Sequence, residues 1–204
     1  MASIDYLTPS IEVLSPENKT YNTRDITLDF RVNEPAQILS MSFDGQANVT
    51  ITGKITLTDL PEGSHTVTVY AENIFKLGSS DTVQFTVDTF PPSISLLSPE
   101  NKTYGTTDIS LDFRVNEAVS QISYVLDGQE NWTIVGNTTL TGLANGDHNL
   151  TVYAQDNAGN IGASETISFS VEVPFPTTFV AAASVASVSI VGAGLLIYFK
   201  KRKR

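Results

Sequence analysis

Histidine occurs at two positions, His65 and His148, which lie 83 residues apart, and the sequence contains no cysteine. The two imidazoles could form a metal site or a catalytic dyad only if distant parts of the chain brought them together. We expect each of them instead to hydrogen-bond to nearby backbone at a turn. The lack of cysteine excludes disulfides, thiolate nucleophiles, zinc–cysteine sites and iron–sulfur clusters.

Oxygen-bearing side chains gather at Asp156, Asn157 and Asn160, which makes these residues a candidate calcium site because Ca²⁺ prefers oxygen ligands. Their spacing is not that of an EF-hand loop, and Asn-Ala-Gly-Asn is also ordinary turn sequence, so both interpretations stay open. The sequence has no glycine-rich phosphate loop, no Gly-x-Ser-x-Gly and no His-Glu-x-x-His. We therefore expect no catalytic residue, no cofactor and no enzymatic activity.

Oppositely charged residues stand two positions apart at Asp29 and Arg31, and again at Asp112 and Arg114. On one face of a strand each couple predicts a solvated ion pair that contributes little to stability. Aromatic residues in loops are the candidates for contact with a ligand, although packing against the core is the alternative for each of them; these are Tyr21, Tyr104 and Trp132.

Six asparagines begin an Asn-x-Thr sequon with no proline at the middle position, and these are Asn18, Asn48, Asn101, Asn131, Asn137 and Asn149. Such sequons also arise by chance in a chain rich in threonine and serine. On a segment outside the cell they predict N-glycosylation.

These residues belong to a tandem duplication. Residues 9–71 align with residues 92–154 without a gap, and 39 of the 63 positions are identical. Apolar residues alternate with polar ones, as in Ile26, Leu28, Phe30 and Val32, which is the period of a half-buried strand. The same alternation is found at Leu39, Met41 and Phe43, at Val49 and Ile51, at Val67, Val69 and Ala71, and at Val83, Phe85 and Val87. Asp-Gly and Pro-Glu-Gly turns separate such runs, so each copy predicts about seven strands and a β-sandwich.

Two motifs, Gly63-x-His65-x-Val67 and Gly146-x-His148-x-Leu150, resemble the turn into strand F of immunoglobulin-like domains. Histidine stands where those domains have the tyrosine of the tyrosine corner, and an aliphatic residue stands where they have cysteine. Residues 9–172 as a whole resemble the tandem Ig-like and fibronectin-type-III-like repeats of archaeal and bacterial surface proteins. The first copy departs from that pattern at residues 72–76. The resemblance implies an all-β fold of two tandem Ig-like antiparallel β-sandwiches and implies no particular activity.

The segment Phe179–Phe199 has 21 residues without a charge, proline, asparagine or glutamine, which is long enough for a helix to span a bilayer. Lys200 to Arg204 are all basic, and the positive-inside rule places them in the cytoplasm and the repeats outside. All 22 acidic residues precede residue 173, so residues 1–178 carry 7 − 22 = −15, which argues against binding to nucleic acid.

The predicted organisation is a leader at 1–8, a first repeat at 9–88, a proline-containing linker at 89–92, and a second repeat at 93–172. A juxtamembrane segment at 173–178, a transmembrane helix at 179–199 and a basic cytoplasmic tail at 200–204 follow. Residues 1–5 carry no signal-peptide pattern. We interpret the chain as a fragment of a longer surface protein or one with a misassigned or engineered start; a tail-anchored protein with cytosolic repeats is the alternative.

The leading functional hypothesis is a non-catalytic, single-pass cell-surface protein whose repeats serve as a stalk, spacer or adhesion module. The alternatives are a module that binds a surface protein or a glycan through its loops, and the C-terminal stalk of a larger surface enzyme. The membrane is the one partner that the sequence indicates, and nothing in it indicates an oligomeric state.

Overall fold

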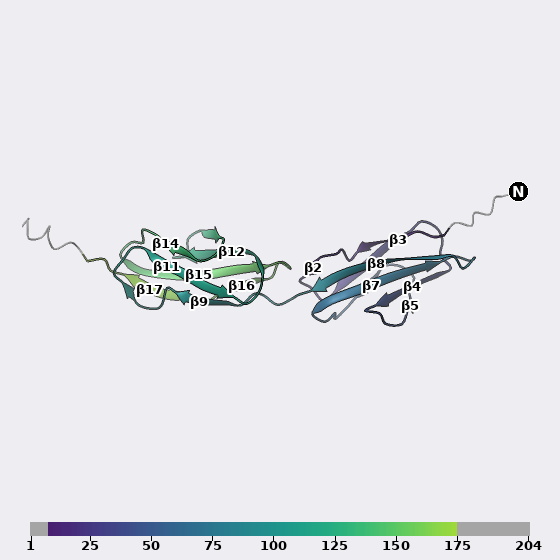
Figure 1. Cartoon of the computed structure of the whole chain (residues 1–204), viewed down its shortest axis with the longest axis horizontal. Helices are drawn as coiled ribbons and strands as arrows, with labels where there is room; N and C mark the ends of the chain where they lie inside the picture. The colour runs from purple at the N-terminus through teal and green to yellow at the C-terminus, as the bar shows by residue number, and fades with distance from the viewer. Residues whose placement is uncertain (1–7, 175–204) are drawn as a thin grey trace, which may run out of the picture.

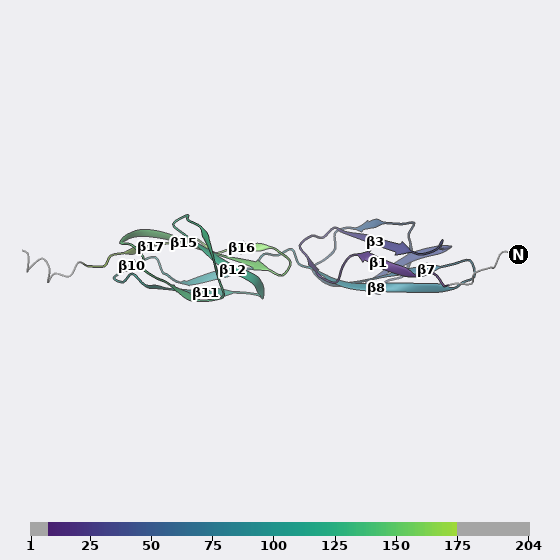
Figure 2. The ribbon, with the colours of Figure 1, turned by 90° about the horizontal axis from the view of Figure 1, so that it is seen from above.

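The structure is a computed structural model that describes residues 8–174, and in these residues every regular element is a β-strand. The strands form two groups that lie end to end along the long axis of the molecule (Figure 1). A view turned by 90° shows the same in-line arrangement, with one extended segment between the groups (Figure 2).

The first group contains two sheets that face one another. Three strands form one sheet in the order β1-β3-β6, and five form the other in the order β2-β8-β7-β4-β5. Their bounds are β1 Ile11–Ser15, β2 Thr20–Tyr21, β3 Ile26–Val32, β4 Ile38–Phe43, β5 Val49–Thr50, β6 Ile55–Leu57, β7 Gly63–Glu72 and β8 Gly78–Val87.

The second group repeats this plan with the sheets β9-β11-β14 and β10-β17-β15-β12-β13, the short strand β16 adding to β15. The bounds are β9 Ile94–Ser98, β10 Thr103–Tyr104, β11 Ile109–Val115, β12 Val119–Leu126, β13 Asn131–Ile134, β14 Thr138–Leu140, β15 Gly146–Asp156, β16 Ile161–Ala163 and β17 Ile167–Val171. The single strand β8 of the first group corresponds to the pair β16 and β17.

The long strands β7 and β15 pass through the middle of the larger sheets and carry the alternation that builds each core. On β15 the side chains of Leu150, Val152 and Ala154 are buried while their neighbours face outward. Val67, Val69 and Ala71 do the same on β7. Each core is closed from the opposite sheet by fully buried leucines, Leu28 and Leu111. Burial of such side chains is the main source of stability in a domain of this size.

One strand pair in each group is parallel, which differs from the purely antiparallel sandwich that we predicted. Strand β2 pairs in parallel with β8, and β10 pairs in parallel with β17. The cause is a crossing of the chain from one sheet to the other at Pro16 and at Pro99. Proline has no N–H for the ladder, so β1 and β9 end there and the chain continues beside the last strand of the other sheet.

The prediction that Val49 shares a buried face with Ile51 is wrong for Val49. Ile51 is 7% exposed, whereas Val49 is 58% exposed on the two-residue strand β5. Strand β5 is the last strand of its sheet, so no neighbour covers its far side.

The predicted ion pair between Asp29 and Arg31 is also not formed. Asp29 instead pairs with Lys54 at 2.8 Å, and Arg31 pairs with Glu12 on the adjacent strand β1. Residues two apart along a strand are almost 7 Å apart, while residues opposite each other on paired strands are about 5 Å apart, so the cross-strand partner wins. In the second group Asp112 accepts a hydrogen bond from Ser110, and the described residues contain no ion pair for Arg114.

The all-β prediction is confirmed for residues 8–174, in which no helix has the length and apolar character needed to cross a bilayer. The predicted helix at 179–199, the basic tail and most of the leader lie outside the described residues.

Candidate functional site

The segment between the two groups, Asp88 to Pro92, is held by hydrogen bonds from both sides. From the first group, Glu62 accepts the backbone N–H of Thr89 at 3.0 Å and the Thr89 hydroxyl at 2.6 Å. From the second group, the side-chain amide of Asn160 donates to the carbonyl oxygen of Asp88 at 2.8 Å and to that of Phe90 at 3.4 Å. We call the residues that make these bonds the junction clamp; they are Glu62, Asp88, Thr89, Phe90 and Asn160. The connection is therefore an ordered part of the structure.

Glu62 is itself fixed by a partner on the first group, because Arg24 donates to it at 2.8 Å. The hydrogen bonds from the Thr89 hydroxyl and backbone, together with Arg24, hold the pKa of Glu62 below its ordinary value. A charged Glu62 accepts stronger hydrogen bonds than a neutral one, so the clamp is strongest with this carboxylate ionised.

Backbone contact adds to the clamp at Gly162 on β16. A Cβ atom at this position would lie 1.8 Å from the carbonyl oxygen of Pro92. Only glycine permits this approach, so β16 rests directly on the start of the second group.

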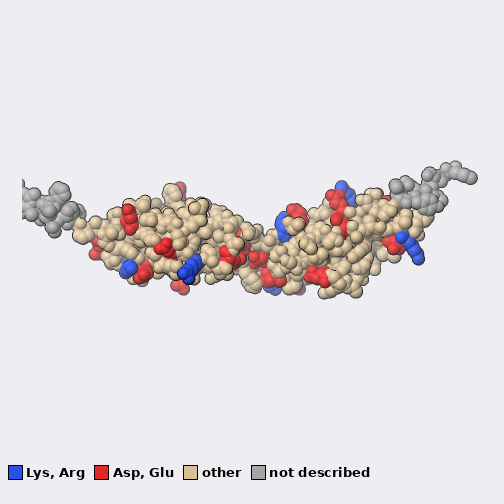
Figure 3. All heavy atoms as spheres, viewed as in Figure 1, with Lys and Arg blue, Asp and Glu red and all other residues tan. Residues whose placement is uncertain are grey.

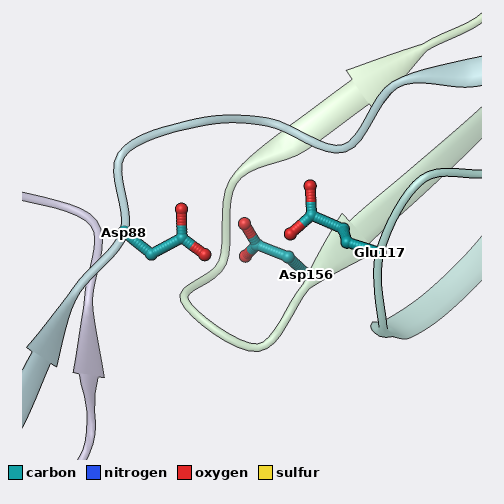
Figure 4. A group of neighbouring side chains, drawn as sticks. All are labelled: Asp88, Glu117 and Asp156. Carbon is teal, nitrogen blue, oxygen red and sulfur yellow. The ribbon is translucent and has the colours of Figure 1, made fainter. Parts of the chain in front are cut away.

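Three carboxylates meet beside the clamp. Asp88 comes from the end of the first group, Glu117 from the turn between β11 and β12, and Asp156 from the last position of β15 (Figure 4). Their ligand atoms all lie within 4.8 Å of one another. Two oxygens that bind the same Ca²⁺ at 2.3–2.6 Å are at most about 5 Å apart, so this group could supply ligands to one hard cation. Acidic side chains are also visible at the waist between the two groups (Figure 3).

Asp156 is the buried member of the three carboxylates, which we call the acidic group, and 2% of its surface is exposed. One carboxylate oxygen accepts the backbone N–H of Gly159 at 2.7 Å and that of Asn160 at 2.9 Å, and the other accepts the Asn160 amide at 2.8 Å. Burial by itself raises the pKa of Asp156, but these hydrogen bonds outweigh burial and hold the pKa below its ordinary value. The carboxylate is therefore charged at neutral pH.

The structure gives the three residues of the predicted calcium site different surroundings. Asn160 faces Asp156 with its NH₂ group, because three acceptors surround that group: the Asp156 carboxylate and the carbonyls of Asp88 and Phe90. An amide nitrogen in this position is not a cation ligand. Asn157 is exposed, and Asp156 alone points into the acidic group. Calcium at this position stays a prediction, with Asp88 and Glu117 in place of the two asparagines.

Sequence reasoning missed Asp88 and Glu117. Glu117 belongs to the repeated run Arg-Val-Asn-Glu and Asp88 precedes the two prolines, but neither pattern indicates that they converge on Asp156. Glu117 reaches Asp156 because β12 pairs with β15 within the second repeat, and Asp88 reaches it because the first repeat docks on the second; the strand pattern encodes neither placement.

The two histidines occupy equivalent places near the start of the central strand of each larger sheet, on β7 and on β15. Nδ1 of His65 lies 2.8 Å from the Asp44 carboxylate and Nε2 lies 2.8 Å from the carbonyl oxygen of Pro61. His148 has the same two contacts, with Asp127 at 2.8 Å and Ala144 at 2.9 Å. The predicted hydrogen bond to local backbone is present in both copies. The two histidines do not share a site.

Both ring nitrogens of each histidine face an oxygen that can only accept a hydrogen bond. Two such acceptors are satisfied together only when both nitrogens carry a proton, which is the charged imidazolium. Burial lowers the pKa of His65 and of His148, but the bond to the backbone carbonyl and the bond to the aspartate raise it more, so both pKa values lie above the ordinary value. The other oxygen of each aspartate accepts a backbone N–H, from Thr66 and Asn149.

The aromatic candidates divide into two kinds. Tyr21 packs edge-on against Phe85 and its hydroxyl accepts the backbone N–H of Glu17 at 2.7 Å. Tyr104 has the same environment, with Phe169 and Glu100. These two tyrosines close the end of each core. Trp132, on the edge strand β13, is 58% exposed and is the aromatic candidate that is open to a ligand.

All six sequon asparagines are exposed. Two of them use the side-chain oxygen within the fold: Asn137 accepts the backbone N–H of Phe113 at 3.1 Å, and Asn149 accepts the hydroxyl of Ser168 at 2.6 Å. Glycosylation of any of the six stays a prediction.

Comparison with solved structures shows which known fold this architecture resembles. The chain superposes on immunoglobulin domains 1–5 of Sidekick-1 with a TM-score of 0.51 and 15% identity, over 83% of this chain and 40% of that one. It also matches the fibronectin(III)-like modules of Clostridium thermocellum CbhA, with a TM-score of 0.47, 15% identity and coverage of 80% and 94%. The fold is that of Ig-like sandwiches. Identities this low show the fold alone.

One sequence relative adds to this. Over 133 residues the chain is 34% identical to halomucin of Haloquadratum walsbyi, a match that covers 61% of this chain and 1% of halomucin. The chain thus corresponds to a very small part of that protein. No protein-family profile matches the sequence.

The paired acceptors around each histidine predict a dependence of stability on pH. A folded pKa above the unfolded value of about 6.5 means that the stabilisation is complete below pH 6.5 and is lost as the pH rises through the folded pKa. Above both values the loss is about 1.4 kcal/mol for each unit of difference. We expect the melting temperature of residues 8–174 to fall between pH 6 and pH 9, and the double variant His65→Gln with His148→Gln to lack that fall. An equal fall in the double variant would contradict the imidazolium assignment.

The acidic group predicts that Ca²⁺ stabilises the second repeat. Ligand at 100 times its Kd adds about 2.7 kcal/mol to the free energy of unfolding, so added Ca²⁺ should raise the melting temperature, and a chelator should reverse the rise. Glu117→Gln should remove the response, whereas Glu130→Gln, which removes an exposed charge elsewhere, should keep it. If Mg²⁺ produces the same rise, or Glu117→Gln responds like the unaltered protein, the carboxylates do not form a calcium site.

Proposed function

We propose that this chain is a non-catalytic stalk of a cell surface, in which two Ig-like repeats act as a spacer that is anchored in a membrane by residues 179–199. The observation that carries the proposal is the junction clamp. A flexible tether would leave the polar groups of the connecting residues to water, whereas here Thr89 bonds to one repeat and the carbonyls of Asp88 and Phe90 bond to the other.

Two further features support a spacer. Pro91 and Pro92 restrict the backbone of the connection, since proline fixes its own φ and biases the preceding residue toward extended geometry. The contact of Gly162 with the Pro92 carbonyl gives the connection a rigid support on the second repeat. Each restriction reduces bending between the repeats, and resistance to bending is what a spacer needs.

The similarity to halomucin supports exposure at a cell surface, because the name of that relative indicates a mucin-like protein. Six exposed sequon asparagines fit the same environment. The apolar segment 179–199 and the five basic residues after it support a single membrane span with the C-terminus in the cytoplasm.

A second candidate function rests on Trp132. A tryptophan that is 58% exposed on an edge strand suits recognition of a protein or glycan, because aromatic side chains dominate such contacts. The first repeat has Val49 at the equivalent position, so this candidate belongs to the second repeat.

The spacer proposal predicts an extended particle in solution. At roughly 40 Å per Ig-sized sandwich, residues 8–174 should have a maximum dimension of about 80 Å by X-ray scattering. Asn160→Ala removes the donor to the Asp88 and Phe90 carbonyls, so we expect a broader distribution of distances. Asn157→Ala alters an exposed neighbour and should leave the distribution unchanged. A compact particle of about 50 Å for the unaltered protein would favour the ligand-binding alternative.

The anchor proposal predicts the topology of the full chain. Protease added to intact cells should degrade the repeats and spare the basic tail, because clustered positive charges resist translocation. An epitope tag at each end of the chain makes the two fates separately visible on a blot. Repeats that survive protease until the membrane is permeabilised would establish the tail-anchored arrangement with cytosolic repeats.

A further inference from the structure

The outer faces of the larger sheets of the two repeats carry equivalent hollows, and each hollow has a sequon asparagine at its rim. In the second repeat the hollow holds about 370 Å³, and its lining includes Asn131, Ser123, Tyr153 and Gln155. In the first repeat it holds about 410 Å³, and its lining includes Asn48, Ser40, Tyr70 and Glu72. Each of these residues stands 83 positions from its counterpart. The coincidence of hollow and sequon is thus present twice.

The hollow follows from the side chains that stand in register across three strands. Thr133 on β13 pairs with Ser123 on β12, which in turn pairs with Tyr153 on β15. Ser123 is small and only 6% exposed, so it forms a low floor between the threonine and the tyrosine ring. The row Thr50, Ser40 and Tyr70 gives the first repeat the same profile.

The sequon itself is presented to this hollow. Asn131 and Thr133 are two apart on a strand and therefore project from the same face, while Trp132 projects from the other. These are the two side chains that a glycosyl transferase reads. Unlike Asn137 and Asn149, neither Asn48 nor Asn131 has its side-chain amide in a hydrogen bond within the described residues 8–174.

We propose that Asn48 and Asn131 carry N-linked saccharides whose first sugar packs into the neighbouring hollow, against the ring of Tyr70 or Tyr153. The inference rests on the proposed location of the repeats outside the cell. An aromatic ring offers the apolar C–H face of a sugar a matching surface, and a carboxylate or carboxamide at the rim, Glu72 or Gln155, can bond to its hydroxyl groups.

The covalent step uses a saccharide carried on a lipid phosphate or pyrophosphate, supplied by a membrane transferase. The side-chain nitrogen of Asn131 forms a bond to the anomeric carbon and loses one proton. The bond between that carbon and the phosphate oxygen breaks, and the lipid phosphate leaves with the electron pair. The reaction needs no oxidant or reductant.

The position of the two asparagines gives the saccharide a structural role. Strands β5 and β13 are the last strands of their sheets within the described residues, and a free edge offers unpaired backbone groups to other chains. A saccharide that starts at the edge and lies inward over the sheet covers this edge at both repeats. It therefore opposes edge-to-edge pairing of neighbouring copies.

The test measures how accessible each tyrosine is to nitration by tetranitromethane, with peptide mass spectrometry to assign the sites. In full-length protein from its natural host, Asn131→Gln should speed nitration of Tyr153 severalfold and leave Tyr70 unchanged. Asn48→Gln should have the reverse pattern. Asn101→Gln removes a sequon in the loop between β9 and β10 and should change neither tyrosine. In protein made in a host without N-glycosylation, Asn131→Gln should have no effect on Tyr153.

Two outcomes would overturn the proposal. One is an occupied Asn131 with equal nitration of Tyr153 in the unaltered protein and in Asn131→Gln. The other is bare Asn48 and Asn131 in a protein that carries saccharides at its other sequons. A protein that is bare at all six sequons and protected from external protease would show instead that the surface location is wrong. Scattering by residues 8–174 tests the spacer independently of any glycan.

Discussion

The inward face of the central strand in the larger sheet of each repeat, β7 or β15, is the constraint on which the structure depends. On β15 this face carries His148 first, then Leu150, Val152 and Ala154, and finally Asp156. The three apolar residues hold the two sheets together, and a polar residue is buried at each end of the row. On β7 the row begins with the buried His65, and the buried Asn73 stands one position after the last residue of the strand. A shift by one residue would expose the apolar row and would break the polar contacts at both ends together.

The polar ends of this row have different tasks. At one end the histidine ties the turn that carries Asp44 or Asp127 to the start of the central strand, and stacks on a phenylalanine of the core. Because this chain has no cysteine, no disulfide joins its two sheets, and these histidine contacts help to hold the end of each sandwich together. At the other end, Asp156 organises the turn that presents Asn160 to the connecting segment. The core strand therefore determines how the second repeat meets the first.

Period-2 patterns such as Ile26 to Val32 were sufficient to predict strands, because successive side chains of a half-buried strand point alternately to the core and to solvent. Val49 escaped that rule because its strand lies at a sheet edge, where the pattern of one strand does not reveal what covers it. Arg31 was assigned the wrong partner since a strand pattern says nothing about which residue stands opposite. Of the three carboxylates, the sequence singled out Asp156 alone: Glu117 reaches it through the pairing of β12 with β15, and Asp88 through the docking of the two repeats. Tertiary placement decides such contacts, and the sequence of each repeat is compatible with many placements.

The connection between the repeats is directional. The end of the first repeat contributes an acidic residue, Asp88, and the turns of the second repeat that face it contribute Glu117, Asp156 and Asn160, which receive it. The exit of the second repeat again bears an acidic residue, Glu172, whose N–H bonds to the Tyr104 carbonyl as that of Asp88 bonds to Tyr21. Such a head-to-tail interface is heterologous and need not close into a ring. The first repeat departs from this receiving pattern at residues 72–76, so it is duplication of the second repeat that would lengthen the protein by a fixed step with the same kind of interface, and the number of such copies would set its length.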